Sequence, residues 1–401
     1  MNPATSNRLT RGLLFLTVFL DLLGFGMVLP LMPLYASDAR FRATPAEVGA
    51  LMAIFSAMQF LFAPFWGRLS DRVGRKPVLL IGLFGSSISY LLYGLAASLP
   101  MLFLARGLAG FMGANIAVAQ AAMADLSPPE ERARAMGFIG AAFGLGFILG
   151  PLFGGVLAPL GLAAAPLAAA LVTLLNGLGT LFWLPESKAA TATPSGRSHP
   201  LSRQTWRDAA RFPGALAVCF CTGLFTTFFA AFEVVLPLWG SRHEGWDMTT
   251  TGWVFTFVGM VVVIVQGGLM RPLVRRLGEK GLVRAGLFLV GTGLLLLGTW
   301  SQGWGSVLFA LGLVACGAGL VNPGLSSLAS LNADAASQGL ILGLFQSMGA
   351  LGRMTGPVVG GEGFESWQGT LFTATAVGMA GLLGLFLLLE RKMRTAKETP
   401  A

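Results

Sequence analysis

The chain has 401 residues, of which 54% are hydrophobic and only 11% are charged. An average soluble protein has about 25% charged residues, so this chain has too few to cover a folded surface of its size. The composition therefore excludes a soluble enzyme and a soluble binding domain, and it predicts a surface that faces lipid. Because one membrane span takes roughly 20 apolar residues, the length leaves room for about twelve spans and no separate soluble domain.

Apolar runs of that length recur along the chain. They lie at 12–36, 46–66, 77–97, 99–124, 134–158, 162–184, 213–240, 250–270, 282–300, 304–328, 338–361 and 367–389. One long polar stretch, 185–212, interrupts the series, and its Pro, Gly and Ser residues are typical of a linker. The sequence thus predicts an all-α membrane protein of twelve transmembrane helices, with a six-helix bundle at 1–184, a cytoplasmic linker at 185–212 and a second six-helix bundle at 213–401.

The formal net charge is +9, which in a soluble protein would suggest a nucleic-acid partner. Here the basic residues stand in short segments between the apolar runs, and 22 of the 27 Lys and Arg residues fall on the side of the N-terminus. Positive charge marks the cytoplasmic side of a membrane protein. We therefore expect both termini in the cytoplasm and no nucleic-acid partner.

Reactive side chains are scarce in the apolar runs. Cys219, Cys221 and Cys316 are predicted to be buried free thiols, and the two histidines fall in predicted loops. No apolar run has a set of His, Ser and acid or a cluster of metal ligands, and the sequence has no phosphate-binding Walker loop. The sequence therefore predicts neither an enzyme nor a metal or nucleotide cofactor.

A glycine-rich pattern occurs once in each half, in the fifth run and 206 residues later in the eleventh. Glycines spaced by four residues leave a smooth helix face for close packing, and a proline among them kinks the helix. Such a repeat predicts two halves of the same orientation that rock about one central site, although simple packing would use the same residues. The predicted hinge residues are Gly146, Gly150, Pro151, Gly154, Gly356 and Pro357.

Segment 67–76 reads Gly-Arg-Leu-Ser-Asp-Arg-Val-Gly-Arg-Lys and resembles the signature loop of the major facilitator superfamily. Glycines at both ends would permit a tight turn, and the carboxylate could accept hydrogen bonds from a helix N-terminus. The resemblance implies that this helix is the eleventh, beginning near Ser337, and that the contact locks the outward-facing state. The alternative is a basic loop with one neutralising acid. The predicted switch residues are Gly67, Asp71, Arg72, Gly74, Arg75 and Lys76.

Three further segments narrow the resemblance. Segment 142–155 looks like the antiporter motif of drug/proton exporters, segment 104–114 is similar to the family's Arg-x-x-x-Gly-x-x-Gly element, and segment 19–33 resembles the first helix of twelve-helix drug/proton antiporters, the tetracycline exporters among them. By this resemblance the chain is identified as a member of that antiporter family. The resemblance implies the major facilitator fold and proton-coupled export.

Two of these segments place a charge within an apolar run. Asp21 lies nine residues after Gly12, which at about 1.5 Å per residue puts it near the bilayer midplane. A carboxylate at that depth is costly as an anion, which suits a proton carrier. Arg106 lies in the fourth run, where a charge costs at least ~2.5 kcal/mol, so it should be paired or face a water-filled cavity. A structural ion pair between Asp21 and Arg106 is the alternative.

Glu233 and Arg353 are charges without a counterpart in the family signature. Both are predicted in the outer half of the membrane at similar depth, where they either pair or leave Glu233 as a second proton or cation site. Polar residues in the runs are candidates for lining the substrate cavity. The predicted cavity residues are Asp21, Gln59, Asn115, Gln120, Glu233, Gln346 and Arg353.

Together these features predict a secondary transporter that exports lipophilic, cationic or zwitterionic drugs by alternating access. Asp21, Arg106 and Glu233 are the predicted proton-coupling residues, and the proton replaces any cofactor. The predicted setting is a monomer in a bacterial cytoplasmic membrane, with lipid, protons and a small lipophilic substrate as partners and antibiotic resistance as the consequence. Two alternatives stay open: a symporter or uniporter for a sugar, siderophore or other metabolite, and a membrane sensor that has lost transport.

Overall fold

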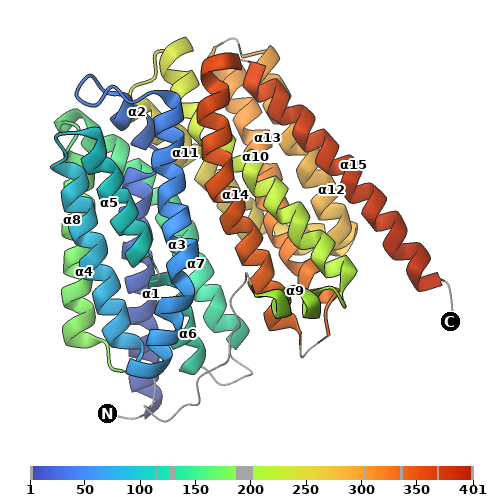
Figure 1. Ribbon diagram of the computed structural model, residues 1–401, viewed down its shortest axis with the longest axis horizontal. Coiled ribbons are helices and arrows are strands. Elements are labelled where there is room, and N and C mark those ends of the chain that lie inside the picture. Colours follow the sequence, from blue (N-terminus) through green and yellow to red (C-terminus); the bar gives the residue numbers. More distant parts are fainter. Residues whose placement is uncertain are drawn as a thin grey trace. The chain divides into compact units, whose positions relative to one another are not determined.

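The computed structural model describes residues 3–113, 115–126, 132–186, 202–301, 303–334, 337–367 and 370–398 (Figure 1). Contacts divide the chain into two compact units. The first comprises Met1–Arg197 and Gly240–Thr256, and the second comprises Ser198–Trp239 and Phe257–Ala401. The division predicted from the sequence, into bundles at 1–184 and 213–401 on either side of a linker, remains a prediction.

The helices of the first unit account for six spans. They are α1 (Pro3–Val28), α2 (Met32–Ser37), α3 (Pro45–Val73), α4 (Arg75–Gly94), α5 (Leu99–Met112), α6 (Asn115–Asp125), α7 (Arg132–Leu157) and α8 (Ala164–Trp183). α1 and α2 together form one apolar stretch, Thr10–Ser37, and α5 and α6 form another, Leu99–Asp125. α3 begins with a capping box, in which Thr44 accepts from the backbone N–H of Glu47 and the Glu47 side chain accepts from that of Thr44.

The remaining helices begin with a short one, α9 (Arg203–Ala209). It is followed by α10 (Pro213–His243), α11 (Met248–Ile264), the π-helix η3 (Val265–Leu269), α12 (Met270–Thr299), α13 (Trp304–Leu331), α14 (Gln338–Trp367) and α15 (Thr370–Glu398). α10 and α11 contribute residues to both units. Gly278 interrupts α12 with a φ of 64°, a left-handed conformation that favours glycine.

Twelve spans follow from these bounds. Within the described residues, ten stretches are long and apolar enough to cross a membrane. One of them, Met248–Thr299, is 52 residues long and contains two spans, because Gly278 divides it. α14 is the twelfth, with 30 residues, which at about 1.5 Å per residue exceeds the roughly 30 Å hydrocarbon core. The predicted all-α fold of twelve transmembrane helices is confirmed.

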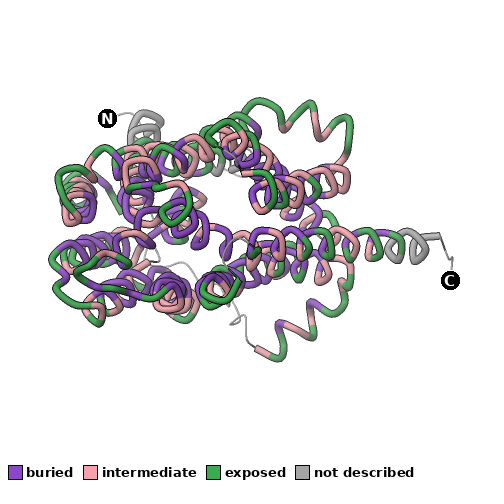
Figure 2. The backbone as a smooth tube through the Cα atoms, turned by 90° about the horizontal axis from the view of Figure 1, so that it is seen from above, coloured by how far each residue is buried: buried purple, intermediate pink, exposed green. Residues whose placement is uncertain are grey.

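Each unit has an apolar core, and large apolar side chains also cover its outside. In the first unit Leu14, Leu79, Ala122 and Met123 are fully or almost fully buried and pack in one cluster. In the second unit Val265, Leu282 and Leu320 form a smaller cluster. Exposed residues recur along most of the helices (Figure 2), and many are large and apolar, such as Phe182 and Trp183. An apolar exterior suits lipid as the solvent.

The prediction of a ten-residue loop at 67–76 is wrong. α3 continues to Val73 and α4 begins at Arg75, so Gly74 alone is non-helical, with a φ of 103°. Gly67 lies inside α3, where an added Cβ would meet nothing within 4 Å, so it makes no turn. Segment 68–73 consists of residues that a helix tolerates, and the residue that follows it is a glycine, a common helix terminator.

The predicted linker is also partly helical. Arg203–Ala209 forms α9, which Ser202 caps by accepting a hydrogen bond from the backbone N–H of Gln204 at 3.3 Å. The polar composition of the segment predicted a linker, and within it a serine followed by good helix formers is sufficient for two turns of helix. The part of the linker at 187–201 lies outside the described residues.

Candidate functional site

Asp21 lies half-buried on α1, and its partner comes from α6. The Asn115 side-chain amide donates to Asp21 Oδ1 at 3.1 Å. Asn115 begins α6, shortly after α5 ends at Met112 with Gly113 as its C-cap. Gly82 of α4 leaves the space for this amide, because an added Cβ there would collide with Asn115 Oδ1. Asp21 and Asn115, both predicted to line the cavity, are thus brought together.

Arg106 lies on α5 with only 2% of its surface exposed. Its guanidinium carbon stands 4.5 Å from the centre of the Phe55 ring on α3, a cation–π geometry. Among the described residues, no acid lies within 4.0 Å of it, and its Nε and Nη2 atoms have no hydrogen-bond partner. The alternative prediction of a direct ion pair between Asp21 and Arg106 is therefore wrong for this structure, because the Asp21 carboxylate is bonded to Asn115 instead.

Tyr90 of α4 is a residue of this cluster that the sequence analysis missed. It interacts electrostatically with both Asp21 and Arg106, and an added Cβ at Gly24, one turn from Asp21, would lie 3.5 Å from its ring. A usable signal was present: the chain has three tyrosines, and Tyr35, Tyr90 and Tyr93 all fall in the first unit. The Tyr35 hydroxyl donates to the backbone oxygen of Tyr93 at 3.0 Å.

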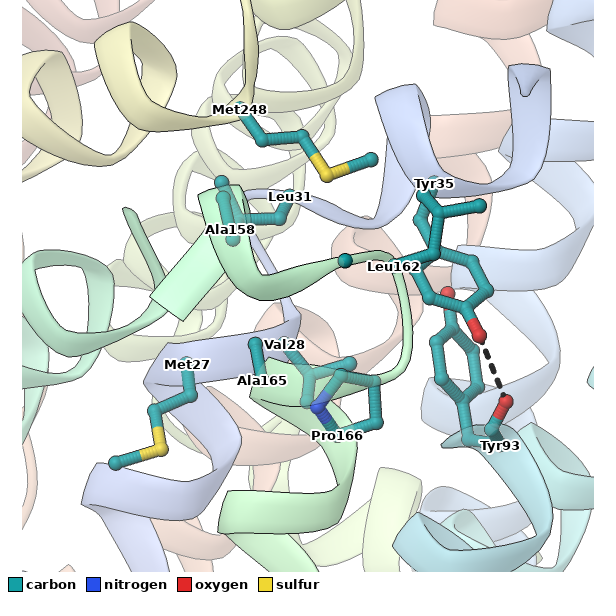
Figure 3. Close-up of a pocket in the computed structure, with 11 residues that line it drawn as sticks. Met27, Val28, Leu31, Tyr35, Tyr93, Ala158, Leu162, Ala165, Pro166 and Met248 are labelled. Carbon is teal, nitrogen blue, oxygen red and sulfur yellow. Dashed lines mark hydrogen bonds between the residues drawn. The ribbon is translucent and has the colours of Figure 1, made fainter. Parts of the chain in front are cut away.

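An apolar pocket lies beyond the C-terminal end of α1 (Figure 3). Met27, Val28, Leu162 and Met248 line it together with Tyr35 and Tyr93. None of the residues predicted to line the substrate cavity borders this pocket. The pocket therefore offers apolar contacts but no charged group.

The predicted glutamine candidates lie in different surroundings. The Gln59 amide of α3 donates to the backbone oxygen of Gly113 at 2.7 Å and so satisfies a carbonyl at the end of α5. Gln120 of α6 and Gln346 of α14 are exposed on their units. Gln59 therefore supports the helix break that positions Asn115, while Gln120 and Gln346 remain predicted cavity residues.

Glu233 and Arg353 belong to the second unit, on α10 and α14. Glu233 is half-buried, whereas Arg353 is exposed on the described unit. No ion pair of 4.0 Å or less joins these two described residues, although their charges interact. The structure thus places them near one another without the direct pair that one reading of the sequence expected, and the Glu233 carboxylate is left for other partners.

Arg75 is the centre of a polar network at the ends of α3, α4 and α6. It is buried, and its Nη1 atom lies 2.8 Å from Asp71 Oδ1 and donates to Ser70 Oγ at 2.7 Å. Its Nε atom donates to Asp125 Oδ2 at 2.9 Å. Asp71 and Arg75, four residues apart in the sequence, therefore bind each other within the first unit. The predicted latch between Asp71 and the eleventh helix remains a prediction.

Glu186, which follows α8, caps the N-terminus of α4. Its two carboxylate oxygens accept from the backbone N–H groups of Arg75 at 2.8 Å and Lys76 at 3.1 Å. A carboxylate is favourable at this position because the first amides of a helix have no partner within the helix. Sequence analysis missed both Glu186 and Asp125, although each is the acid that closes an apolar run, a signal that could have been used.

We expect Arg75→Gln to lower the free energy of unfolding by about 2 kcal/mol, because it leaves Asp71 and Asp125 without their shared cation. Thermal unfolding of the purified protein in detergent measures the change. Arg72→Gln is the matched control: Arg72 is exposed, so its loss should change stability by less than about 0.5 kcal/mol. Equal stability of the two variants would contradict the role assigned to Arg75.

The glycine-rich helices pack closely on the first long helix of their half, α7 on α1 and α14 on α10. A Cβ added at Gly150 of α7 would lie 2.6 Å from the Gly26 Cα atom of α1, and one at Gly146 would lie 2.6 Å from Leu22 Cβ. In the second unit, a Cβ at Gly356 of α14 would collide with the backbone oxygen of Thr227 on α10. Both halves therefore use the repeated glycines for the same contact. Pro151 and Pro357 lie within α7 and α14.

The family model of the Major Facilitator Superfamily matches residues 14–357 and 269–401. The chain belongs to this superfamily of membrane transporters and is not an enzyme. It is 33% identical to the class C tetracycline resistance protein of Escherichia coli over 86% of both chains. It is 35% identical to the class G protein of Vibrio anguillarum over 90% of both, and 29% identical to multidrug resistance protein 2 of Bacillus subtilis over 96% of both. These relatives are named for resistance to tetracycline or to several drugs.

Solved structures agree with this assignment. The human organic anion transporter MFSD10 has a TM-score of 0.69 and 26% sequence identity, and the match covers 96% of this chain and 98% of that chain. The nucleoside transporter NupG has a TM-score of 0.76 at 15% identity, and the match covers 97% of this chain and 99% of that chain. The latter similarity concerns the fold alone.

Proposed function

We propose that the chain exports lipophilic drugs by exchanging them for protons. The observation that carries this proposal is the state of Asp21: a carboxyl within a membrane span that is bonded to a neutral amide, with no cation of the described residues in ion-pair distance. A carboxylate tied to a buried arginine would hold its charge, whereas one bonded to an amide can take up and release a proton. The relatives named for tetracycline and multidrug resistance support export as the direction.

In this mechanism a proton from outside neutralises Asp21, or Glu233, and weakens the binding of a cationic or zwitterionic substrate. The halves at 1–184 and 213–401, joined by 185–212, then rock about the Gly-Pro helices while Asp71 locks and releases the eleventh helix. No cofactor is required because the proton gradient supplies the energy. The proposed setting is a monomer in a bacterial cytoplasmic membrane with both termini inside.

Inside-out vesicles test this function. With tetracycline as the probe and an imposed pH gradient, we expect accumulation that stops when an ionophore dissipates the gradient, together with proton movement opposite to the drug. Movement of drug and proton in the same direction would indicate a symporter, and accumulation to equilibrium without a gradient would indicate a uniporter. No movement of any probe across a drug panel would favour the sensor.

We expect Glu233→Gln to narrow the range of exported cations while neutral substrates continue to move. Glu233 is half-buried and has no direct ion pair with Arg353, so its charge is available to a cationic group of the substrate. Vesicle uptake of a cationic dye and of an uncharged drug measures the two activities. Arg353→Gln, alone and combined with Glu233→Gln, completes a double-mutant cycle.

If the losses of cation export in the two single variants add up to the loss in the double variant, the residues act independently. This result supports a role for Glu233 in recognising the cationic substrate. A double variant that is less impaired than either single variant would instead show that the two residues act as a pair. Equal loss of cationic and neutral export in Glu233→Gln would contradict recognition of cations.

A further inference from the structure

The Arg106 guanidinium is a buried charge with too few hydrogen-bond acceptors among the described residues. It is almost completely buried, and two of its three nitrogens, Nε and Nη2, have no hydrogen-bond partner among the described residues. The guanidinium contacts the face of the Phe55 ring, which interacts with the cation but accepts no hydrogen bond in the plane of the guanidinium. A buried cation without an acceptor is costly, so a site of this kind favours a ligand that supplies acceptors, and an anion supplies the opposite charge as well.

The acids described in the first unit that could take that place are engaged elsewhere. Asp21, the acid predicted to pair with Arg106, is bonded to Asn115. Asp71 and Asp125 are both bound by Arg75, and Glu186 caps α4. The edge of the Arg106 guanidinium, which carries its donors, is therefore left for a group that does not belong to the described chain.

We propose that Arg106 binds an anionic carboxylate group of the transported compound. The planar guanidinium offers parallel N–H donors that match two oxygens, and Phe55 holds its plane from one face. This inference rests on the proposed export function and adds that, among the transported compounds, those that bear an acidic group bind more tightly than those that lack one. Tyr90, which interacts electrostatically with Arg106 and Asp21, links the anion site to the proton site.

An inorganic anion could supply the same chemistry. A chloride ion that enters with the substrate would satisfy the guanidinium just as a substrate carboxylate does, because both accept hydrogen bonds from it. The two sources differ in one respect: a carboxylate on the substrate makes recognition depend on the structure of the drug, whereas chloride makes it depend on the salt.

Binding to the purified protein in detergent tests the proposal with a matched pair of dyes. The probes are a rhodamine with a free carboxylate and the methyl ester of the same dye, which keeps the cationic ring system and loses the acid. We expect the parent protein to bind the free acid more tightly than the ester. Arg106→Gln should lower the affinity for the free acid by at least about ten-fold, which is the loss expected for hydrogen bonds to a charged group. It should change the affinity for the ester by less than about two-fold.

Two further variants keep the test decisive. Arg106→Lys retains the charge but not the fork of donors, so it should restore part of the affinity for the acid. Arg40→Gln removes an exposed arginine of the same unit and should leave both affinities unchanged. If Arg106→Gln does not fold, Arg106→Lys still tests the proposal, because a weaker preference for the acid over the ester is expected there too.

Equal weakening of acid and ester binding in Arg106→Gln would overturn the proposal, as would a parent protein that binds both dyes equally with and without chloride. Ester binding that requires chloride and is lost in Arg106→Gln would assign the site to the inorganic ion and also overturn substrate recognition. Because binding in detergent needs no gradient, failure of proton-driven export in vesicles would refute the proposed function without affecting this result.

Discussion

Asp21→Asn is expected to abolish proton-driven efflux while the protein remains folded and inserted. The amide keeps the shape of the carboxyl and an oxygen that can still accept from Asn115, so the hydrogen bond of 3.1 Å between α1 and α6 can persist. It cannot take up a proton, and the exchange cycle then lacks its coupling group. Drug uptake into inside-out vesicles under a pH gradient should fall to the level of vesicles without the protein.

A loop acid of the same unit gives the control. Asp38 follows α2 and accepts from the backbone N–H of Arg40 at 3.0 Å, outside the membrane-spanning segments. Asp38→Asn should therefore retain efflux and its pH dependence. Unchanged efflux with a normal pH dependence in Asp21→Asn would remove Asp21 from the mechanism, and loss of folding, seen by size-exclusion chromatography, would show a structural role instead.

The positions of the helices could be predicted from the sequence because each span must bury about 20 apolar residues in lipid. Predictions failed where a segment lies outside the bilayer and local preferences decide its conformation. Segment 67–73 was expected to be a loop because of its charge, but it continues α3, since charged residues with straight side chains are good helix formers and only Gly74 stops them.

The site could be predicted residue by residue but not pair by pair. Asp21, Arg106 and Asn115 were selected because polar groups within apolar runs are costly and so tend to be functional. Which of them bond to each other depends on helix packing. The break after Gly113 and the space left by Gly82 bring Asn115 to Asp21, and neither follows from spacing along the chain. The roles of Asp125 and Glu186 were missed for the same reason, because their partner Arg75 lies on another helix.

The glycines repeated at intervals of four residues make close helix–helix contacts in both halves. The sequence predicted a smooth face on the fifth and eleventh runs, and in the structure these faces lie against the first long helix of each half, α1 and α10. In the first unit that helix is α1, which also carries Asp21. The closeness of α7 to α1 therefore fixes the helix that holds the proposed proton site, so a packing residue on α7 should affect both stability and transport.

Gly150→Ala is expected to lower the free energy of unfolding by about 1–3 kcal/mol and to impair efflux. The new Cβ would lie 2.6 Å from the Gly26 Cα atom and 2.7 Å from its carbonyl carbon, and these are backbone atoms, which cannot rotate away as a side chain can. The two helices must then separate, which moves Asp21 relative to Asn115. Thermal unfolding in detergent and vesicle efflux measure the two effects.

Gly140→Ala on the same helix separates close packing from the general effect of replacing a glycine. An added Cβ at Gly140 meets nothing within 4 Å. Alanine there should therefore act only through its higher helix propensity and raise the free energy of unfolding by up to about 1 kcal/mol. We therefore expect opposite signs for two chemically identical substitutions ten residues apart on α7. If Gly150→Ala proved as stable and active as Gly140→Ala, the contact between α7 and α1 would not limit the position of Asp21, and the glycines of the motif would have to act elsewhere in the transport cycle.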